Sequence, residues 1–161
     1  MEKIKILALG DLANNTVRLK KYLKNTEIHL INFPWNTASK ILDHRDGVEF
    51  FDSIYVKTKI KKINGIKEKF DLCLAISPAG ARLAYLCGLN YMIYFVGHDI
   101  RCPPFVKNII DPFAENEPIL KLNFFERKFY KWVYKNATAV VTTGEEAYSN
   151  LIKHYKTGFR I

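Results

Sequence analysis

The sequence predicts an α/β protein built on a parallel sheet of about six strands, with helices on both faces. Short apolar runs rich in strand-forming residues alternate with segments of helical periodicity along the whole chain. This alternation is typical of a doubly wound sheet, and the fourth run is continuous and apolar, as expected of a strand that is buried on both faces. The strands are predicted at residues 3–9, 27–32, 51–56, 71–76, 91–96 and 138–142.

Capping residues indicate where the helices begin. Asn14 or Asn15 can cap a helix that runs to about residue 24, because a short polar side chain satisfies the free amides of a first turn. Ser77 is followed by Pro78, which is the pattern of a cap and a first helical residue. This second helix is predicted to end at Gly88, which can adopt the left-handed conformation of a helix terminus.

The helix predicted over residues 120–136 has the clearest periodicity in the chain, with an apolar stripe on an otherwise basic surface. The stripe that we expect in the core consists of Leu122, Phe125, Phe129, Trp132 and Val133. A capping box at Thr143 and Glu146 predicts a last helix that ends near residue 154. The lysine-rich residues 57–69 are expected to form a short helix and a turn, and residues 101–118 a long loop.

Right-handed crossovers between parallel strands leave few topologies for these elements. We expect a single domain with the strand order 3-2-1-4-5-6, which is that of a Rossmann-like fold. The switch point of this order lies between the first and fourth strands, and ligands bind outside the carboxyl ends of the strands. The turns that leave strands one, four, five and six therefore form the predicted site.

The turn after the fifth strand is the most polar of these. Gly97 ends an apolar run, and His98, Asp99 and Arg101 follow it. An imidazole, a carboxylate and a guanidinium that follow a buried strand indicate a functional site. The alternative is that Asp99 merely pairs with Arg101 and that His98 is an ordinary turn residue.

Composition limits the class of protein. The chain has 161 residues, of which 48% are hydrophobic and 25% are charged, as in a globular domain with a core of its own. Its 25 basic and 16 acidic residues give a formal charge of +9, which suits nucleic acid, anionic lipid or a phosphorylated ligand. Excess lysine can also serve solubility alone. The three scattered cysteines predict neither a disulfide framework nor a zinc site and fit a reducing, cytoplasmic setting.

Several common motifs are absent from the sequence. There is no Gly-x-Gly-x-x-Gly after the first strand, no Walker A loop and no Gly-x-Ser-x-Gly elbow. The clustered aspartates of a phosphoacceptor receiver are also missing, and no apolar run approaches the roughly 20 residues of a membrane-spanning helix. We therefore expect no metal and no cofactor.

Two short stretches resemble a known family. Phe-Val-Gly-His-Asp-Ile-Arg at residues 95–101 resembles the Gly-(Ser/His)-Asp signature after the fifth strand of the N-terminal domain in GT-B fold glycosyltransferases of the family 4-like group. Ala-Thr-Ala-Val-Val-Thr-Thr-Gly-Glu at residues 137–145 resembles a later stretch of the same domain. As a pattern of strands and helices, the resemblance covers essentially the whole chain.

The resemblance implies a function and a division of labour. Residues 1–161 would be the acceptor-binding domain of a nucleotide-sugar-dependent glycosyltransferase, inactive without an absent C-terminal donor domain. His98 and Asp99 would be catalytic, and Arg101 would hold an anionic group of a saccharide or lipid-linked acceptor. The substrate-binding candidates at this edge are Gly10, Asp11, Ser77, Gly97, Arg101, Thr143 and Glu145.

Two other functions remain open at this point, a non-catalytic Rossmann-like binding or regulatory domain and, from charge alone, a nucleic-acid-binding domain. Basic residues concentrate in two regions, which suggests peripheral contact with the inner face of an anionic membrane. The alternative is a solvated basic surface. The two clusters are Lys57, Lys59, Lys61, Lys62, Lys67 and Lys69, and Lys121, Arg127, Lys128, Lys131 and Lys135, the second with Phe124, Tyr130 and Tyr134 off the core stripe.

Overall fold

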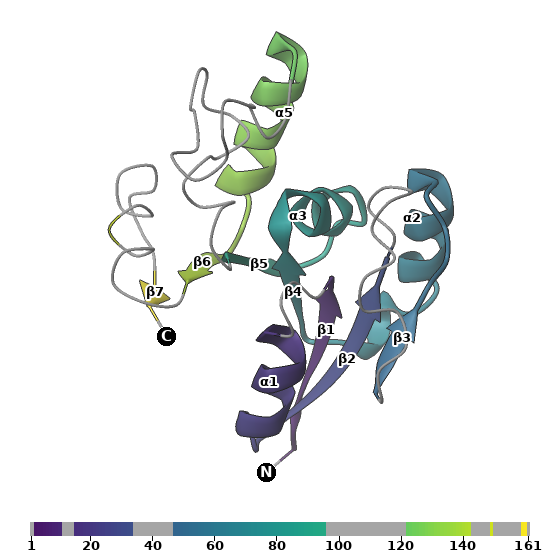
Figure 1. Ribbon diagram of the computed structural model, residues 1–161, viewed down its shortest axis with the longest axis vertical. Helices are drawn as coiled ribbons and strands as arrows, with labels where there is room; N and C mark the ends of the chain where they lie inside the picture. The colour runs from purple at the N-terminus through teal and green to yellow at the C-terminus, as the bar shows by residue number, and fades with distance from the viewer. Residues whose placement is uncertain are drawn as a thin grey trace, which may run out of the picture.

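Seven parallel strands form one sheet in the order β3-β2-β1-β4-β5-β6-β7 (Figure 1). The structure is a computed structural model that describes residues 2–10, 15–33, 47–95, 122–142, 149 and 159–160. The strands are β1 (Ile4–Leu9), β2 (Thr26–Asn32), β3 (Val48–Phe50), β4 (Leu72–Ile76), β5 (Tyr91–Phe95), β6 (Ala139–Thr142) and β7 (Phe159–Arg160). The predicted Rossmann-like order 3-2-1-4-5-6 is confirmed, with the unpredicted β7 added beside β6.

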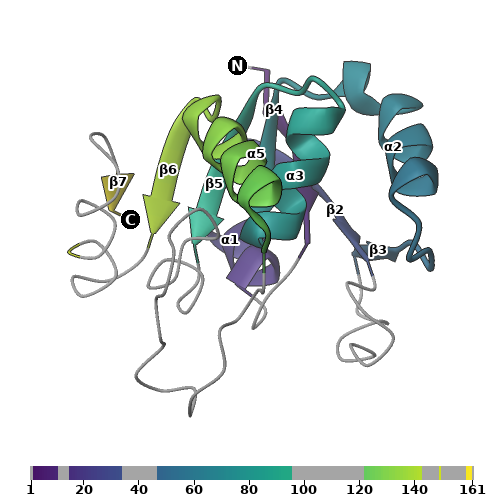
Figure 2. The same cartoon turned by 90° about the horizontal axis from the view of Figure 1, so that it is seen from above.

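Helices lie on both faces of the sheet. The helices whose bounds the structure describes are α1 (Asn15–Tyr22), α2 (Val56–Asn64), α3 (Ser77–Leu86) and α5 (Phe124–Lys135), with a 3₁₀ turn, η1 (Lys67–Lys69). Figures 1 and 2 show α1 on one face and α2, α3 and α5 together on the other. The predicted helix and turn within residues 57–69 correspond to α2 and η1. Of the predicted last helix, the structure describes Ser149 alone, which is helical, and the other residues lie outside the described ranges.

The core has two layers because side chains alternate along each strand. On β1, Leu7 and Leu9 are fully buried toward α3 and α5, while Ile6 and Ala8 are buried toward α1. Both faces of the central strands are therefore apolar, as the continuous apolar runs predicted.

The position of β3 differs from the prediction. Residues 51–56 are rich in strand-forming types, but the strand is Val48–Phe50, and Val48 pairs with Leu30 of β2. Tertiary contacts override propensity here: the Phe51 ring packs edge-on against Phe33, with 6.2 Å between centroids, and Val56 already begins α2.

The buried face of α5 also differs from the prediction. Phe125 and Trp132, expected in the core, are 77% and 53% exposed. Tyr130 and Tyr134, expected on the outer surface, are buried together with Val133. Tyrosine rings bury as much apolar surface as other aromatic rings once the hydroxyl is accommodated, so the helix is rotated relative to the stripe read from its most apolar residues.

Close contact between α3 and the sheet depends on Gly80. A Cβ atom at this position would lie 2.7 Å from the carbonyl oxygen of Leu9 and 3.4 Å from the backbone carbon of Ala75. Both neighbours are backbone atoms at the centre of the sheet, so they cannot move aside cheaply.

We expect Gly80→Ala to lower the free energy of unfolding by about 3 kcal/mol, because the added methyl group must push α3 away from β1. Gly88→Ala is the matched control. Gly88 has φ +64° and open space around its Cβ position, so only the left-handed backbone resists the change, at about 1 kcal/mol. Urea denaturation of both variants measures the difference, and equal losses would contradict the packing argument.

Candidate functional site

The end of β1 forms a tight turn at the carboxyl edge of the sheet. Gly10 has φ +96°, a conformation that side chains disfavour, and its amide donates a 2.9 Å hydrogen bond to the carbonyl oxygen of Ile31. The buried hydroxyl of Thr16, in the first turn of α1, donates to the carbonyl oxygen of Gly10 at 3.3 Å. The turn is therefore tied to both β2 and α1.

The end of β4 leads into α3 without a loop. Ser77 takes φ +66°, and it is the one residue other than glycine with a positive φ in the described part of the chain. Ser77 is the first residue of the helix, Ile76 occupies the cap position, and no side-chain cap hydrogen bond is made. The predicted cap at Ser77 is therefore wrong, because the strand turns directly into the helix through the strained serine.

These two strand ends meet at the switch point of the sheet. The first turn of α3 lies against the last residue of β1, since a Cβ at Gly80 would touch the Leu9 carbonyl. The amino end of α3 therefore faces the gap where the chain order reverses, between β1 and β4. It carries no acidic residue in its first turn, so the amide dipoles of the helix favour an anion there.

The amino end of α5 is different. Asn123 accepts a hydrogen bond from the Glu126 amide at 2.9 Å, and Glu126 accepts one from the Asn123 amide at 2.8 Å. This capping box satisfies its first amides within the helix itself. Of these two helix starts, α3 is the one whose cap residue supplies no acceptor.

Of the predicted site residues, the structure describes Gly10 and Ser77 and places both at this edge, on either side of the contact between β1 and α3. The others lie outside the described residues and remain predictions. These are Asp11, Gly97, His98, Asp99, Arg101, Thr143 and Glu145.

Lys59, a buried lysine in α2, was not among the predicted site residues. Only 4% of the residue is exposed, its ammonium lies 5.3 Å from the centroid of the Phe33 ring, and burial lowers its pKa. The signal was present, because Val56, Lys59 and Ile63 recur at helical spacing on the inner side of α2. Lys59 helps to line a hollow of about 140 Å³ between α2, α3 and α5, together with Ile54, Val56, Ala79, Arg82, Leu83 and Tyr130.

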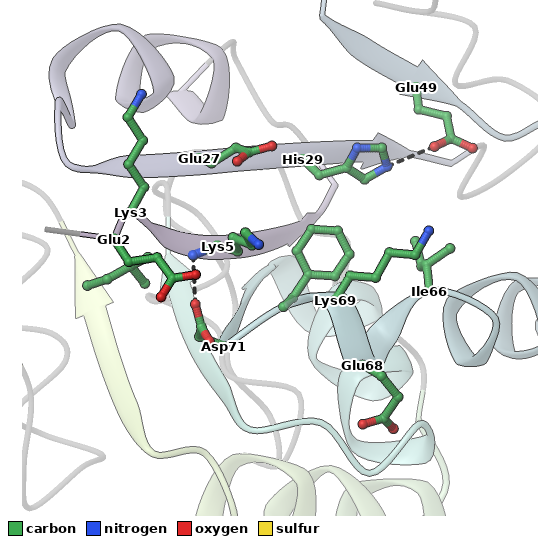
Figure 3. Close-up of a pocket in the computed structure, with 12 residues that line it drawn as sticks. Glu2, Lys3, Lys5, Glu27, His29, Glu49, Ile66, Glu68, Lys69 and Asp71 are labelled. Atoms are coloured by element: carbon green, nitrogen blue, oxygen red, sulfur yellow. Dashed lines mark hydrogen bonds and ion pairs between the residues drawn. The ribbon is translucent and has the colours of Figure 1, made fainter.

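A larger hollow, of about 760 Å³, opens at the amino ends of β1 and β2, opposite the predicted site (Figure 3). Its walls are polar and of mixed charge. His29 Nε2 lies 2.8 Å from a Glu49 carboxylate oxygen, Lys62 Nζ lies 2.5 Å from the other, and the Lys5 amide donates to the Asp71 carboxylate at 2.8 Å. Because Glu49 is paired with Lys62 and His29 and the Asp71 carboxylate accepts a backbone hydrogen bond, we interpret the hollow as a structural groove. In doubly wound folds ligands bind at the carboxyl edge instead.

The described cysteines do not form a reactive centre. Cys73 and Cys87 are free and buried, and burial raises the pKa of both thiols, that of Cys87 to about 11. They are therefore protonated and poor nucleophiles at neutral pH. Within the described ranges no three His, Cys, Asp or Glu side chains are arranged to hold a metal ion, and no helix is long and apolar enough to span a bilayer.

Comparisons with known proteins give structural likenesses only. No family model matches the chain, and no curated protein matches its sequence. The enzyme WbmH of Bordetella bronchiseptica, solved with NAD+, shares 11% identity at a TM-score of 0.45, over 88% of this chain and 56% of its own. WbmG of the same organism, solved with NAD and UDP, shares 13% at 0.45, over 88% and 53%. The PbgP3 protein of Burkholderia pseudomallei shares 13% at 0.37, over 88% and 53%.

The chain therefore spans just over half the length of these structures. The predicted resemblance to GT-B glycosyltransferases is wrong by this comparison, because the structures reported above are not glycosyltransferases and two of them are enzymes solved with NAD. The predicted function as an acceptor-binding domain of a glycosyltransferase is wrong for the same reason. Both stretches that suggested the family include the end of a strand, β5 or β6, and the residues after it in the sequence. Polar turns after buried strands occur in doubly wound folds of many functions. Similarities of this size carry no activity to the present chain, and its fold class follows from the strand order alone.

Glu49 provides a pH-dependent tie between β2, β3 and α2. Burial by itself would raise the pKa of Glu49, but Lys62 and His29 outweigh it and lower the pKa below its ordinary value. Because the folded state favours the ionised carboxylate, this stability is present above the ordinary glutamate pKa. It is lost as the pH falls through the lower pKa of the folded state.

We expect Glu49→Gln to be less stable than the wild type at neutral pH and to match it in acid, where the wild-type carboxylate is also neutral. Chemical denaturation across the acidic range measures this convergence. Glu68→Gln is the control, since Glu68 is exposed and forms no ion pair within the described residues. If the difference in the free energy of unfolding between Glu49→Gln and the wild type stays constant with pH, the proposed ion pairs are contradicted.

Proposed function

We propose that this chain is a Rossmann-like binding domain that takes a nucleotide-type ligand at the carboxyl edge of its sheet. The observation that carries the proposal is the position of the α3 amino end, held by Gly80 against the last residue of β1 at the switch point. Phosphate groups bind where free amides and a helix dipole converge. The ligand class is therefore one with phosphate, and its base or sugar would lie over the strand ends.

Positive charge supports an anionic ligand. The chain carries a formal +9, and Lys59 and Arg82 both line the hollow beside the first turn of α3. Arg82 also lowers the pKa of Tyr130, although burial dominates and raises it overall. The positive charge of Lys59 and Arg82 in this hollow, next to a helix start whose cap residue supplies no acceptor, favours a ligand with phosphate there.

The glycine pattern of this domain is unlike the usual dinucleotide fingerprint. The turn after β1 has a single glycine, Gly10, and it is a later helix, α3, that packs on β1 through Gly80. The close approach of helix and strand, which the fingerprint normally provides at the first turn, is provided here after β4. We infer that the phosphate lies nearer α3 than α1.

We also propose that residues after the neighbouring strands complete this site. Asp11 follows β1, and His98, Asp99 and Arg101 follow β5 in the sequence. The parallel order of these strands supports the proposal that all four contribute to the same edge. Arg101 suits a phosphate or carboxylate of the ligand. Buried free thiols at Cys73 and Cys87 fit a reducing compartment such as the cytoplasm.

Ser77→Asp tests the proposal. An aspartate at the first position of α3 suits the helix dipole, so the fold should be kept or slightly stabilised. The new carboxylate occupies the place proposed for phosphate, so we expect affinity to fall at least about tenfold, or about 1.4 kcal/mol. Isothermal titration with NAD and with UDP, at low ionic strength, measures the change.

Asn64→Asp is the matched control. Asn64 is exposed at the far end of α2, so this variant adds the same charge at the opposite edge of the sheet and should bind as the wild type does. If the wild type binds neither nucleotide, or if both variants lose affinity equally, the proposed site is wrong.

A further inference from the structure

The outer side of α5 exposes large aromatic rings among lysines. Phe124, Phe125 and Trp132 are 63%, 77% and 53% exposed. At about 100° per residue, these rings and three exposed lysines fall within an arc of about 120°. This aromatic–basic face consists of Phe124, Phe125, Lys128, Lys131, Trp132 and Lys135.

Packing of α5 on the domain does not need this face. The opposite side of the helix buries Tyr130, Val133 and Tyr134. The Tyr91 hydroxyl of β5 donates a hydrogen bond to the carbonyl oxygen of Val133, and the Phe129 ring meets Tyr85 of α3 at 5.8 Å between centroids. The rings of Phe124, Phe125 and Trp132 are not part of either core cluster of the described residues. Their exposed apolar surface therefore indicates a binding surface.

The charge of this face is of one sign. Glu126 is the one acidic residue in α5, and its carboxylate is held by the amide of Asn123 at the start of the helix. The three lysines lie between and beside the rings, and Lys135 Nζ lies 5.6 Å from the centroid of the Trp132 ring. The face therefore combines exposed apolar groups with positive charge, and none of its three lysines forms an ion pair with a residue that the structure describes.

We propose that the aromatic–basic face of α5 docks on the surface of an anionic lipid bilayer. Aromatic rings of this size enter the boundary between headgroups and acyl chains, while lysines keep their ammonium groups at the level of the lipid phosphates. Each lysine near such a surface raises affinity about fivefold. The face is rigidly presented, because α5 is anchored from behind and capped at its start.

Two other occupants fit the face less well. The cores of protein interfaces are depleted of lysine, whereas here lysines alternate with the rings. Stacking on nucleic-acid bases needs free ring faces, but Phe124 and Phe125 pack edge-to-face on each other at 5.6 Å and Lys135 lies over Trp132.

Trp132 is a natural reporter of this contact. The chain has two tryptophans, and in the Trp35→Phe background the emission comes from Trp132 alone. With vesicles of phosphatidylglycerol and phosphatidylcholine we expect a blue shift of this emission and quenching by lipids brominated on the acyl chains. With vesicles of phosphatidylcholine alone we expect neither. Equal responses to the two vesicle types, or no response to either, would overturn the proposal.

Charge reversal locates the surface. We expect Lys128→Glu/Lys131→Glu to lower the partition coefficient for anionic vesicles at least about twentyfold in sedimentation, since two favourable charges are lost. Phe124→Ala/Phe125→Ala should also lower this partition coefficient, and the loss should persist at high salt because it comes from apolar contacts. Lys57→Glu/Lys61→Glu makes the same charge change at exposed positions of α2. A loss as large with the α2 pair would overturn the proposed surface.

The same variants separate the other occupants. If Phe124→Ala/Phe125→Ala abolishes self-association or binding to single-stranded RNA while the wild type ignores vesicles, the face serves a second copy or a nucleic acid and the lipid proposal is wrong. Ser77→Asp should leave vesicle binding unchanged, so failure of the nucleotide site and failure of the lipid surface are distinguishable.

Discussion

The close approach of α3 to the end of β1 is the contact on which the rest of this fold depends. Gly80 allows it, because any side chain there would collide with the carbonyl oxygen of Leu9. With α3 in place, its inner residues Ala81 and Ala84 can also be fully buried against the sheet. Small residues along one side of α3 therefore set the spacing between helix layer and sheet, and larger groups such as Phe95 fill what remains.

The same contact brings the start of a helix to the carboxyl edge of the sheet, which is where ligands bind in doubly wound folds. A strand that turned into its helix through an ordinary loop would leave the first amides of α3 farther from β1. Because Ser77 adopts a left-handed backbone conformation, β4 continues into α3 with no loop residues between them. A strained residue at such a position is a common feature of sites that hold their donors ready before the ligand arrives. The geometry that packs the core and the geometry that presents the amides are thus a single arrangement.

The features that depend on sequence pattern could be predicted from the sequence. The features that depend on which side chains the core buries could not. Alternating elements and apolar runs were enough for the strand order and for the end of α3 at Gly88, which indeed has a positive φ. The rotation of α5 was missed because the predicted stripe included Trp132 and left out Tyr130 and Tyr134, although the two tyrosine rings are the ones that the core buries. At the site, Gly10 could be named from its place after a strand, but the backbone of Ser77 could not, since a serine before proline suggests an ordinary cap. The family resemblance failed for a related reason, because it rested on short turns that many α/β folds share.

The sheet ends at β3 in a strand of three residues, Val48–Phe50. Its central residue, Glu49, is an acid held between Lys62 and His29. A short border strand with a charge at its middle offers few free backbone groups and an ionic barrier to any strand that tries to pair with it. Growth of the sheet by edge-to-edge addition is therefore discouraged on this side. The ion pairs that fasten the strand to its neighbours also help to protect the molecule from aggregation through its own backbone.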